Sequence, residues 1–388
     1  MKVTEASTLL NAVTPEILGE TGTVTEDLSN IVDVGRAFSS LGSTAYDNFV
    51  KKMHDQIGYI RFVDRPLAPM APSVMMDGWE WGSIMEKVRV AMPDAMPDQA
   101  WQLNDGQSYD PNILYLPDVS AKFYNDRVAY AVPHCTVDRQ LKSAFAGPAQ
   151  MLGFLSAVET SVNNGIVKNT DALILRTINN FVGETFYDAM PGGTYTGAGN
   201  TRAVNLLYAY NQTVATPITA SAAMTDPGFM RFAAMVMRNV KQRMAAMGTT
   251  FNIAGAENHT PADRLKVVLH SDFVSGAETY LYGGAGQFTE RGILFPQADV
   301  VPFWQGSGTG WGISDTQAIK ITTSEGHTVS LTGILGVMFD REALGVSNLD
   351  RHVTSDYNHV AEFWSFLHKF SAGFFNDFSE NFVVFYAA

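Results

Sequence analysis

Cysteine is almost absent from this sequence, because Cys135 is the single cysteine among 388 residues. A lone thiol excludes an intrachain disulfide and a metal cluster held by cysteines. This usage favours a reducing compartment. Long apolar runs are missing as well. Glu5 interrupts the N-terminus before a signal-peptide core can form, and the longest uncharged stretch, residues 203–225, contains polar amides and Pro217 that a bilayer would reject. We therefore expect a soluble protein without a membrane span.

Charged side chains are also scarce. They make up 17% of the residues, against roughly 25% in an average globular domain. Hydrophobic residues reach 46%, so much of the surface is expected to be hidden in contacts. The charges sum to −13, which argues against a chain that grips nucleic acid by neutralising phosphates.

Two alternating segments organise the chain. Residues 78–90 and 119–132 place successive side chains on opposite faces, as strands do. Residues 91–118 between them contain several prolines and a turn-prone Asn-Asp-Gly, so they are too long and too broken for a tight hairpin. The sequence predicts a two-stranded arm with an irregular tip.

This arm is rich in aromatic side chains. An isolated two-stranded ribbon is marginally stable in water, and large apolar groups on it need cover. A neighbouring copy of the same chain is the economical cover, so the pattern predicts self-assembly. The predicted inter-subunit contacts are Trp79, Trp81, Met85, Trp101, Tyr109, Tyr115, Phe123 and Tyr124.

A long helical pattern follows the arm. Asp138 is a good N-cap, and apolar residues recur over residues 141–166 at helical spacings. We expect a bend at Pro148 and an interruption over residues 165–169, after which a second amphipathic helix starts. The Gly- and Thr-rich residues 191–200 predict a linker.

A mixed unit of helices and strands is expected over residues 201–345. Its clearest helix has Asp226 as N-cap and Pro227 in the first helical position. Strands are expected at residues 265–270, 299–304, 318–323 and 328–339.

The two ends of the chain contrast with each other. Residues 1–35 predict an extended arm with short helical pieces. Residues 357–388 are dense in aromatics and predict two strands joined by a turn near Asn376. We expect the apolar terminal strand to pair with the domain that holds the long helix, so that residues 201–345 form an insertion within that domain.

The order of these elements resembles the major capsid proteins of tailed phages, which have the Hong Kong 97 fold. Short stretches are similar too: RFVDRPLAPM at residues 61–70, WEWGSIMEKV at 79–88, DRQLKSAFAG at 138–147, FDREALGVSNLDRHVTSDYN at 339–358 and ENFVVFYAA at 380–388. The resemblance covers nearly the whole chain and implies an α+β fold. The implied parts are residues 1–77 (N-terminal arm and first helix), 78–132 (extended two-stranded loop), 133–200 (peripheral domain with a long spine helix), 201–345 (inserted axial domain) and 346–388 (C-terminal strands returning to the peripheral domain).

The function implied by this resemblance is structural. The chain would self-assemble into pentamers and hexamers of an icosahedral head that encloses double-stranded DNA without binding it specifically. The implied partners are a scaffolding protein, a portal protein and, as a further class, decoration proteins. The implied location is the virion shell, assembled in the host cytoplasm. The alternative is an encapsulin-type nanocompartment, which shares the fold but houses a cargo enzyme.

Two family features are not carried over directly. Some members begin with a long scaffolding segment that a protease removes, but the segment before the first expected helix is short here, so a separate scaffolding protein is expected. The covalent cross-link of some members needs a lysine and an asparagine that cannot be placed in this sequence. Lys87 and Lys122 lie in the loop, where we expect both to be solvated.

Catalytic and cofactor-binding alternatives find little support. The glycine-rich residues 193–199 and 306–312 lack the context and the G-K-[ST] sequel of a phosphate loop. His134 and Cys135 are adjacent, so on a strand they would point to opposite faces. No metal-ligand spacing links His259, His270, His327, His352, His359 and His368. We expect no enzyme, no cofactor and no metal.

The acidic balance suggests a role for the basic residues. A lining that does not hold DNA would let the polymer move during packaging. The hypothesis is that basic side chains contact carboxylates within and between subunits instead. The residues proposed for such contacts are Arg127, Arg139, Lys142, Arg291 and Arg351.

Overall fold

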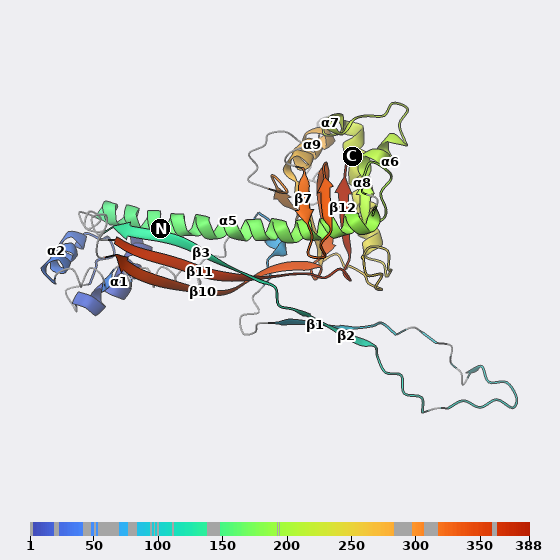
Figure 1. The fold of residues 1–388 in the computed structure, drawn as a ribbon, viewed down its shortest axis with the longest axis horizontal. Helices are drawn as coiled ribbons and strands as arrows, with labels where there is room; N and C mark the ends of the chain where they lie inside the picture. Colours follow the sequence, from blue (N-terminus) through green and yellow to red (C-terminus); the bar gives the residue numbers. More distant parts are fainter. Residues whose placement is uncertain are drawn as a thin grey trace.

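The computed structural model describes residues 3–18, 23–41, 48–49, 52, 70–76, 84–137, 148–282, 297–305, 317–358 and 363–388, apart from residues 94, 97, 99–100, 111, 192 and 194. A long helix runs along a narrow sheet, and a unit of helices and strands is built around one end of it (Figure 1). Two N-terminal helices lie near the other end, and a thin loop projects from the junction between the narrow sheet and the unit.

Helix α5, Pro148–Ala189, is the spine of the molecule and continues for 42 residues without a break. The interruption expected at residues 165–169 is therefore wrong. A Cβ on Gly165 would lie 2.7 Å from Cγ1 of Val132, so the glycine allows a strand to pack closely against the helix. Asn169 stays helical and donates from Nδ2 to the carbonyl oxygen of Gly165 at 2.8 Å. The expected N-cap, Asp138, lies outside the described residues.

A three-stranded antiparallel sheet lies along this helix. Its order is β10 (Leu344–Asn358), β11 (Phe363–Asn376) and β3 (Arg127–Val137). Phe370 of β11 and Tyr130 of β3 lie opposite each other with ring centroids 5.1 Å apart, and they pack with Val162 and Ile166 of the helix. This contact covers part of the apolar surface of α5.

The second alternating segment of the arm is two strands rather than one. β2 (Val119–Tyr124) pairs with β1 (Met85–Val90), whereas β3 begins at Arg127 and pairs with β11. The uninterrupted strand expected over residues 119–132 is therefore wrong. The two-residue break redirects the chain from the projecting ribbon to the sheet under the spine helix.

The unit at the end of the spine is built on a five-stranded sheet. The strand order is β4 (Ala203–Asn205), β12 (Phe382–Tyr386), β9 (Ile334–Asp340), β5 (Leu265–His270) and β6 (Asp299–Val301). Helices α6 (Leu206–Asn211), α7 (Ala220–Ala223), α8 (Pro227–Met244) and α9 (Ser271–Tyr282) accompany it. The predicted cap of α8 is confirmed, because the side chain of Asp226 accepts from the backbone N–H of Phe229 at 2.8 Å.

The two faces of this sheet have separate cores. Val383 and Phe385 pack with α8 and α9, whereas Phe382, Val384 and Tyr386 pack with α5. The terminal strand β12 therefore lies between the spine and the helices of the mixed unit. It pairs with β9 and β4, so the expectation that the terminal strand pairs with the domain of the long helix is wrong. Of the two strands expected over residues 357–388, β11 is the one that joins the sheet along that helix.

Three further elements complete the described chain. β7 (Ile319–Thr322) and β8 (Thr328–Leu331) form a hairpin against α5, and η2 (Pro72–Val74) is a short 3-10 turn. Residues 1–35 were expected to be an extended arm with short helical pieces. The helices are longer than expected, because α1 (Val3–Leu18) has 16 residues and α2 (Ile31–Leu41) has 11. Leu10 and Val13 are buried, which shows that packing stabilises α1.

Candidate assembly interface

The β1–β2 ribbon has two chemically different faces. Its antiparallel register sets Met85 opposite Tyr124, Lys87 opposite Lys122 and Val88 opposite Ala121. Because side chains alternate along each strand, the pairs also alternate between the two faces. The inner face, toward the body of the chain, carries Met85, Lys87, Arg89, Lys122 and Tyr124. The outer face carries Glu86, Val88, Val90, Val119, Ala121 and Phe123.

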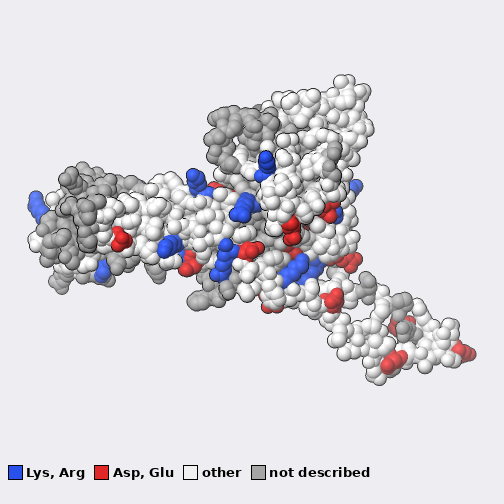
Figure 2. Space-filling view, in the orientation of Figure 1, with Lys and Arg blue, Asp and Glu red and all other residues white. Residues whose placement is uncertain are grey.

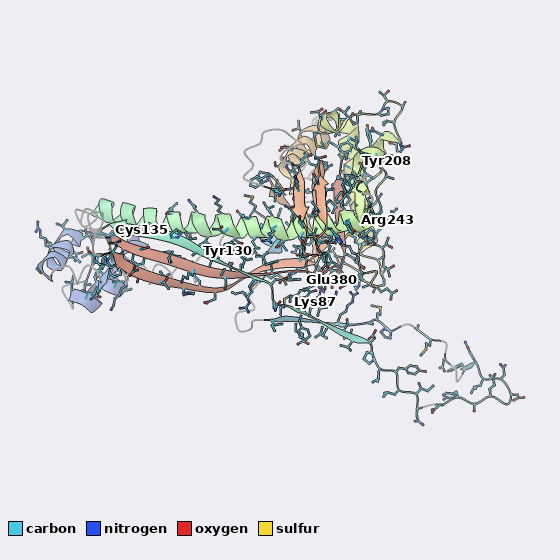
Figure 3. The ribbon with its side chains drawn as sticks, viewed as in Figure 1. Lys87, Tyr130, Cys135, Tyr208, Arg243 and Glu380 are labelled. Atoms are coloured by element: carbon cyan, nitrogen blue, oxygen red, sulfur yellow. The ribbon has the colours of Figure 1, made fainter. Side chains whose placement is uncertain are left out.

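Ion pairs hold the inner face. Lys87 Nζ donates to Oδ2 of Asp377 at 2.7 Å and to Oε1 of Glu380 at 2.6 Å. Lys122 Nζ donates to Oδ1 of the same aspartate at 2.7 Å. We call these four residues the loop-base cluster. Figure 3 shows Lys87 and Glu380 close together where the ribbon leaves the body.

The carboxylates come from the turn between β11 and β12. This turn joins the sheet under the spine helix to the five-stranded sheet, so the loop is anchored where the two sheets meet. Asp377 also accepts from the backbone N–H and the hydroxyl of Ser379, which fixes the position of its carboxylate. Arg89 adds donors to the carbonyl oxygens of Ser379 and Glu257.

Electrostatics in the loop-base cluster favour charged Asp377. Its side chain is 2% exposed, and burial alone would raise its pKa. The hydrogen bonds from Lys122 and Lys87 outweigh burial and hold the pKa of Asp377 well below its usual value. Burial raises the pKa of the nearby Tyr124 hydroxyl, and the charge of Asp377 raises that pKa further.

These contacts correct the expectation for the two lysines. Lys87 and Lys122 were expected to be solvated, yet the side chain of Lys87 is only 17% exposed and both ammonium groups are ion-paired. Their partners follow them by about 250 residues or more, since Lys122 and Asp377 are 255 positions apart. No local sequence pattern could have found this pairing.

The outer face has no comparable cover within the described chain. Phe123 is 65% exposed, and Ile84, Val88, Val90 and Val119 are each exposed over more than half of their surface. An exposed apolar strip of this kind, which Glu86 interrupts, makes this face a candidate interaction surface. We call these five residues the outer strip.

The irregular tip is also apolar and exposed. Trp101 is 89% exposed, and Leu114, Tyr115 and Leu116 are mostly exposed. Tyr109 is exposed to a smaller extent. The predicted contacts Trp101, Tyr109, Tyr115 and Phe123 are thus free to meet a partner, although nothing among the described residues shows that partner.

The other four predicted contacts behave differently. Met85 and Tyr124 lie on the inner face, where the Tyr124 ring packs 5.2 Å from that of Phe375, so their described contacts are within the chain. Trp79 and Trp81 lie outside the described residues. Sequence reasoning gave weight to aromatics and missed Val88, Val90 and Val119, although their alternation with Lys87 and Arg89 was a usable signal.

The hypothesis about basic residues concerns carboxylate contacts within and between subunits. Within the described chain, Nε and one terminal nitrogen of Arg351 are buried without a hydrogen-bond partner, so they support no such contact inside the subunit. Burial lowers the pKa of Arg351. The described contacts do not test Arg127, and Arg139, Lys142 and Arg291 lie outside the described residues.

The residues considered for catalysis do not form a catalytic site. His134 is half-buried on one face of β3 and Cys135 is exposed on the other, as the alternation of side chains on a strand requires. His327 lies 3.1 Å from Glu184 and stacks on Tyr187, which ties the β7–β8 hairpin to the spine helix. Within the described ranges, no group of His, Cys, Asp and Glu side chains could hold a metal ion. No helix in those ranges is long and apolar enough to cross a membrane.

Comparison with solved structures identifies the class of fold. The capsid structure of Staphylococcus phage Andhra matches with a TM-score of 0.50 at 10% identity, over 84% of this chain and 86% of that one. A structure from bacteriophage P68, described by its head fiber and inner core protein gp22, gives a TM-score of 0.47 at 8% identity, over 84% and 86% of the two chains. The capsid structure of Cyanophage P-SCSP1u gives 0.42 at 12% identity, over 81% and 86%. The Andhra match shows that this mixed helix and sheet fold occurs in a phage capsid structure.

The sequence defines the family more closely. A profile of Phi29-like phage major capsid proteins matches residues 10–386, so the chain belongs to the Phi29-like phage major capsid protein family. It is a structural subunit that self-assembles into the capsid shell of the virion, and the encapsulin alternative is not favoured. A search of curated proteins finds no match. Membership of a structural capsid family implies that the chain is not an enzyme.

Proposed function

We propose that residues 84–124 form the extended loop of a Hong Kong 97-type subunit and that this loop binds across a neighbouring subunit during shell assembly. The observation that carries the proposal is the outer strip, which stays exposed while the inner face of the same ribbon is ion-paired. Each Å² of apolar surface that the loop buries on a neighbour contributes about 25 cal/mol, so a single contact is stabilised modestly. Repetition around closed rings would make the shell stable.

The loop-base cluster sets the direction of the loop in this proposal. A two-stranded ribbon cannot hold its own orientation, because it lacks further strands. Two lysines on one carboxylate fix the ribbon against the turn between β11 and β12, so the outer strip faces away from the body. A fixed orientation lowers the entropy lost when the loop binds.

The proposed division of the chain follows from the same likeness. The spine helix with β3, β10 and β11 corresponds to the peripheral domain. The five-stranded unit corresponds to the axial domain, which would close pentamers and hexamers of an icosahedral head around double-stranded DNA. A scaffolding protein, a portal protein and decoration proteins are the further partners that we propose by family likeness.

Charged substitutions on the outer strip test the proposal. We expect Val88→Glu/Phe123→Glu to leave the subunit folded, since both positions are exposed, and to abolish closed shells, since two carboxylates would be buried at each interface. The control is Ser330→Glu, at an exposed position of β8 away from the loop. Circular dichroism reports folding, and sedimentation velocity with negative-stain microscopy reports assembly.

Normal shells formed by Val88→Glu/Phe123→Glu would overturn the loop proposal. Loss of assembly together with loss of folding would also count against it, because it would place the outer strip in the core of the subunit. Failure of the Ser330→Glu control to assemble would show that any added charge blocks the shell, and the outer strip would then lose its special role.

A further inference from the structure

Helix α8 concentrates positive charge in an acidic protein. The chain has a net charge of −13, yet α8 contains Arg231, Arg238, Lys241 and Arg243 and no acidic residue. Its buried residues, among them Phe229, Ala233, Met237 and Val240, follow one face and pack on the five-stranded sheet. The basic residues are therefore concentrated away from the core.

The exposed face of α8 combines basic side chains with an apolar one. Arg231, Met235, Arg238 and Gln242 follow one another at spacings of four, three and four, so they form one stripe along the helix. Met235 is 52% exposed in the middle of this stripe. Within the described part of the chain, no ion pair or hydrogen bond involves the guanidinium groups of Arg231 and Arg238. We call these four residues the α8 stripe.

The projecting loop has the opposite charge. Residues 91–118 contain Asp94, Asp98, Asp105, Asp110 and Asp118 and no lysine or arginine. Figure 2 shows acidic side chains and no basic ones on the part of the tip that is visible. The tip also exposes Trp101, Leu114 and Leu116, so it combines negative charge with apolar surface as the α8 stripe combines positive charge with Met235.

The two surfaces do not meet within one chain. The tip points away from the body, whereas α8 lies on the far side of the five-stranded sheet from the spine helix (Figure 1). Figure 3 places Arg243, near the end of α8, well away from the loop tip. The basic residues within the loop, Lys87, Arg89 and Lys122, all lie at its base and are engaged there.

We infer that the acidic tip of one subunit docks on the α8 stripe of another subunit. This inference rests on the proposed function, because it assumes that the loop reaches a neighbouring copy, and it names the surface that receives the tip. Complementary charge would speed encounter and fix the register, while Trp101 and the leucines would bury against Met235. The contact would be sensitive to salt, since the charges are exposed before docking.

Packaged DNA is the competing occupant of the α8 stripe. Arginines on one helix face can neutralise phosphates, and a stripe that faced the interior of the shell would do so. The acidic tip matches the α8 stripe better, because it supplies negative charge and apolar surface together, whereas a phosphate backbone has no apolar surface to cover the exposed Met235.

A charge exchange between the two surfaces tests the inference. We expect Arg231→Glu/Arg238→Glu to lower the yield of closed shells at least about tenfold, because attraction becomes repulsion at every equivalent interface. Asp105→Lys/Asp110→Lys should have the same effect for the same reason. When all four substitutions are combined in one chain, the shell yield should return to within about threefold of the unmodified protein.

The control is Lys320→Glu/Arg341→Glu, which changes the net charge equally at exposed positions outside both surfaces and should assemble normally. All variants are compared by sedimentation and electron microscopy, with thermal unfolding of unassembled subunits as the check on folding. A combined variant that stays unassembled although it folds would overturn the inference. Normal shells from Arg231→Glu/Arg238→Glu would also overturn it, and reduced DNA content in those shells would assign the stripe to DNA.

The outcomes also separate this inference from the proposed function. If Val88→Glu/Phe123→Glu still forms normal shells, the outer strip is not an assembly surface and the proposed function of the loop fails. If shells form and only the charge exchange gives no rescue, the loop proposal stands and the α8 stripe is not the surface that receives the tip.

Discussion

The two faces of the β1–β2 ribbon differ more than any other pair of surfaces in the loop. On the inner face Lys87, Lys122 and Tyr124 find partners in the same chain. On the outer face Val88 and Phe123 find no cover in the described chain. Residues that are neighbours in sequence thus have different surroundings: the inner face is held within the subunit, and the outer face is the one that we propose for contacts between subunits.

Removal of the shared carboxylate is expected to have the largest effect on the inner face. Asp377→Asn leaves Lys87 and Lys122 beside a neutral side chain, so we expect the free energy of unfolding to fall by about 3 kcal/mol. This is the low end of the range for a broken buried ion pair, because Lys122 is partly exposed to water. Urea unfolding of unassembled subunits measures this change. The control Asp350→Asn, at a largely exposed carboxylate, should change it by less than about 0.5 kcal/mol. Equal effects of the two substitutions would contradict a special role for Asp377.

Acid should weaken the loop-base cluster in the same way. The pKa of Asp377 in the folded chain lies below that of an unfolded aspartate. Its contribution to stability is therefore complete above about pH 4 and is lost as the pH falls through the lower folded pKa. We expect the difference in stability between the unmodified subunit and Asp377→Asn to shrink as the pH falls below about 4. A difference that stays constant from pH 6 to the acid limit would show that the charge of Asp377 does not matter.

Adjacent residues on the two faces should respond in opposite ways. Tyr124→Ala removes a ring that packs on Phe375, so we expect the subunit to lose about 2 kcal/mol of stability. Phe123→Ala should change subunit stability by less than about 0.5 kcal/mol, since that ring is mostly exposed. Phe123→Ala should instead lower the shell yield, because the ring would be buried only between subunits. Both quantities can be measured on the same preparations, and a reversed order would refute the assignment of the faces.

The smallest expected effect concerns the spine helix, whose contact with β3 lies entirely within the chain. Gly165→Ala forces a methyl group against Val132, which costs about 1 to 3 kcal/mol and is partly offset by about 1 kcal/mol of helix propensity. We expect a net loss of about 1 kcal/mol in thermal or urea unfolding. Ser161→Ala, at an exposed position of α5, should be neutral or slightly stabilising. A stabilised Gly165→Ala would mean that the helix and β3 are not in close contact.

Local chemistry explains which parts of the fold could be predicted from the sequence. Asp226 and Pro227 mark the start of α8 because capping depends on neighbouring residues. Alternation predicted the β1–β2 ribbon because it too is a pattern of neighbouring residues. The break between β2 and β3 was missed because both strands keep the alternating pattern, and what separates them is their pairing with different strands.

Long-range packing accounts for most of the misses. Glycine disfavours a helix, so Gly165 was expected to interrupt the spine. It lies within the helix where Val132 of β3 packs against it and leaves no room for a larger side chain. The apolar β12 could have entered either sheet, and its position between α5 and α8 depends on contacts with β4 and β9. In the candidate interface, alternation predicted that two strands pair in this region, but the ion pairs of Lys87 and Lys122 join residues too far apart in sequence for any local pattern to predict them.

A structure of the assembled shell by electron cryomicroscopy tests the central claim most directly. Ile84, Val88, Val90, Val119 and Phe123 should be covered by a neighbouring subunit, while Lys87 and Lys122 keep their contacts with Asp377 in the same chain. A closed shell in which these five apolar side chains remain in solvent, or pack on the body of their own subunit, would contradict the division of the ribbon into a face for folding and a face for assembly.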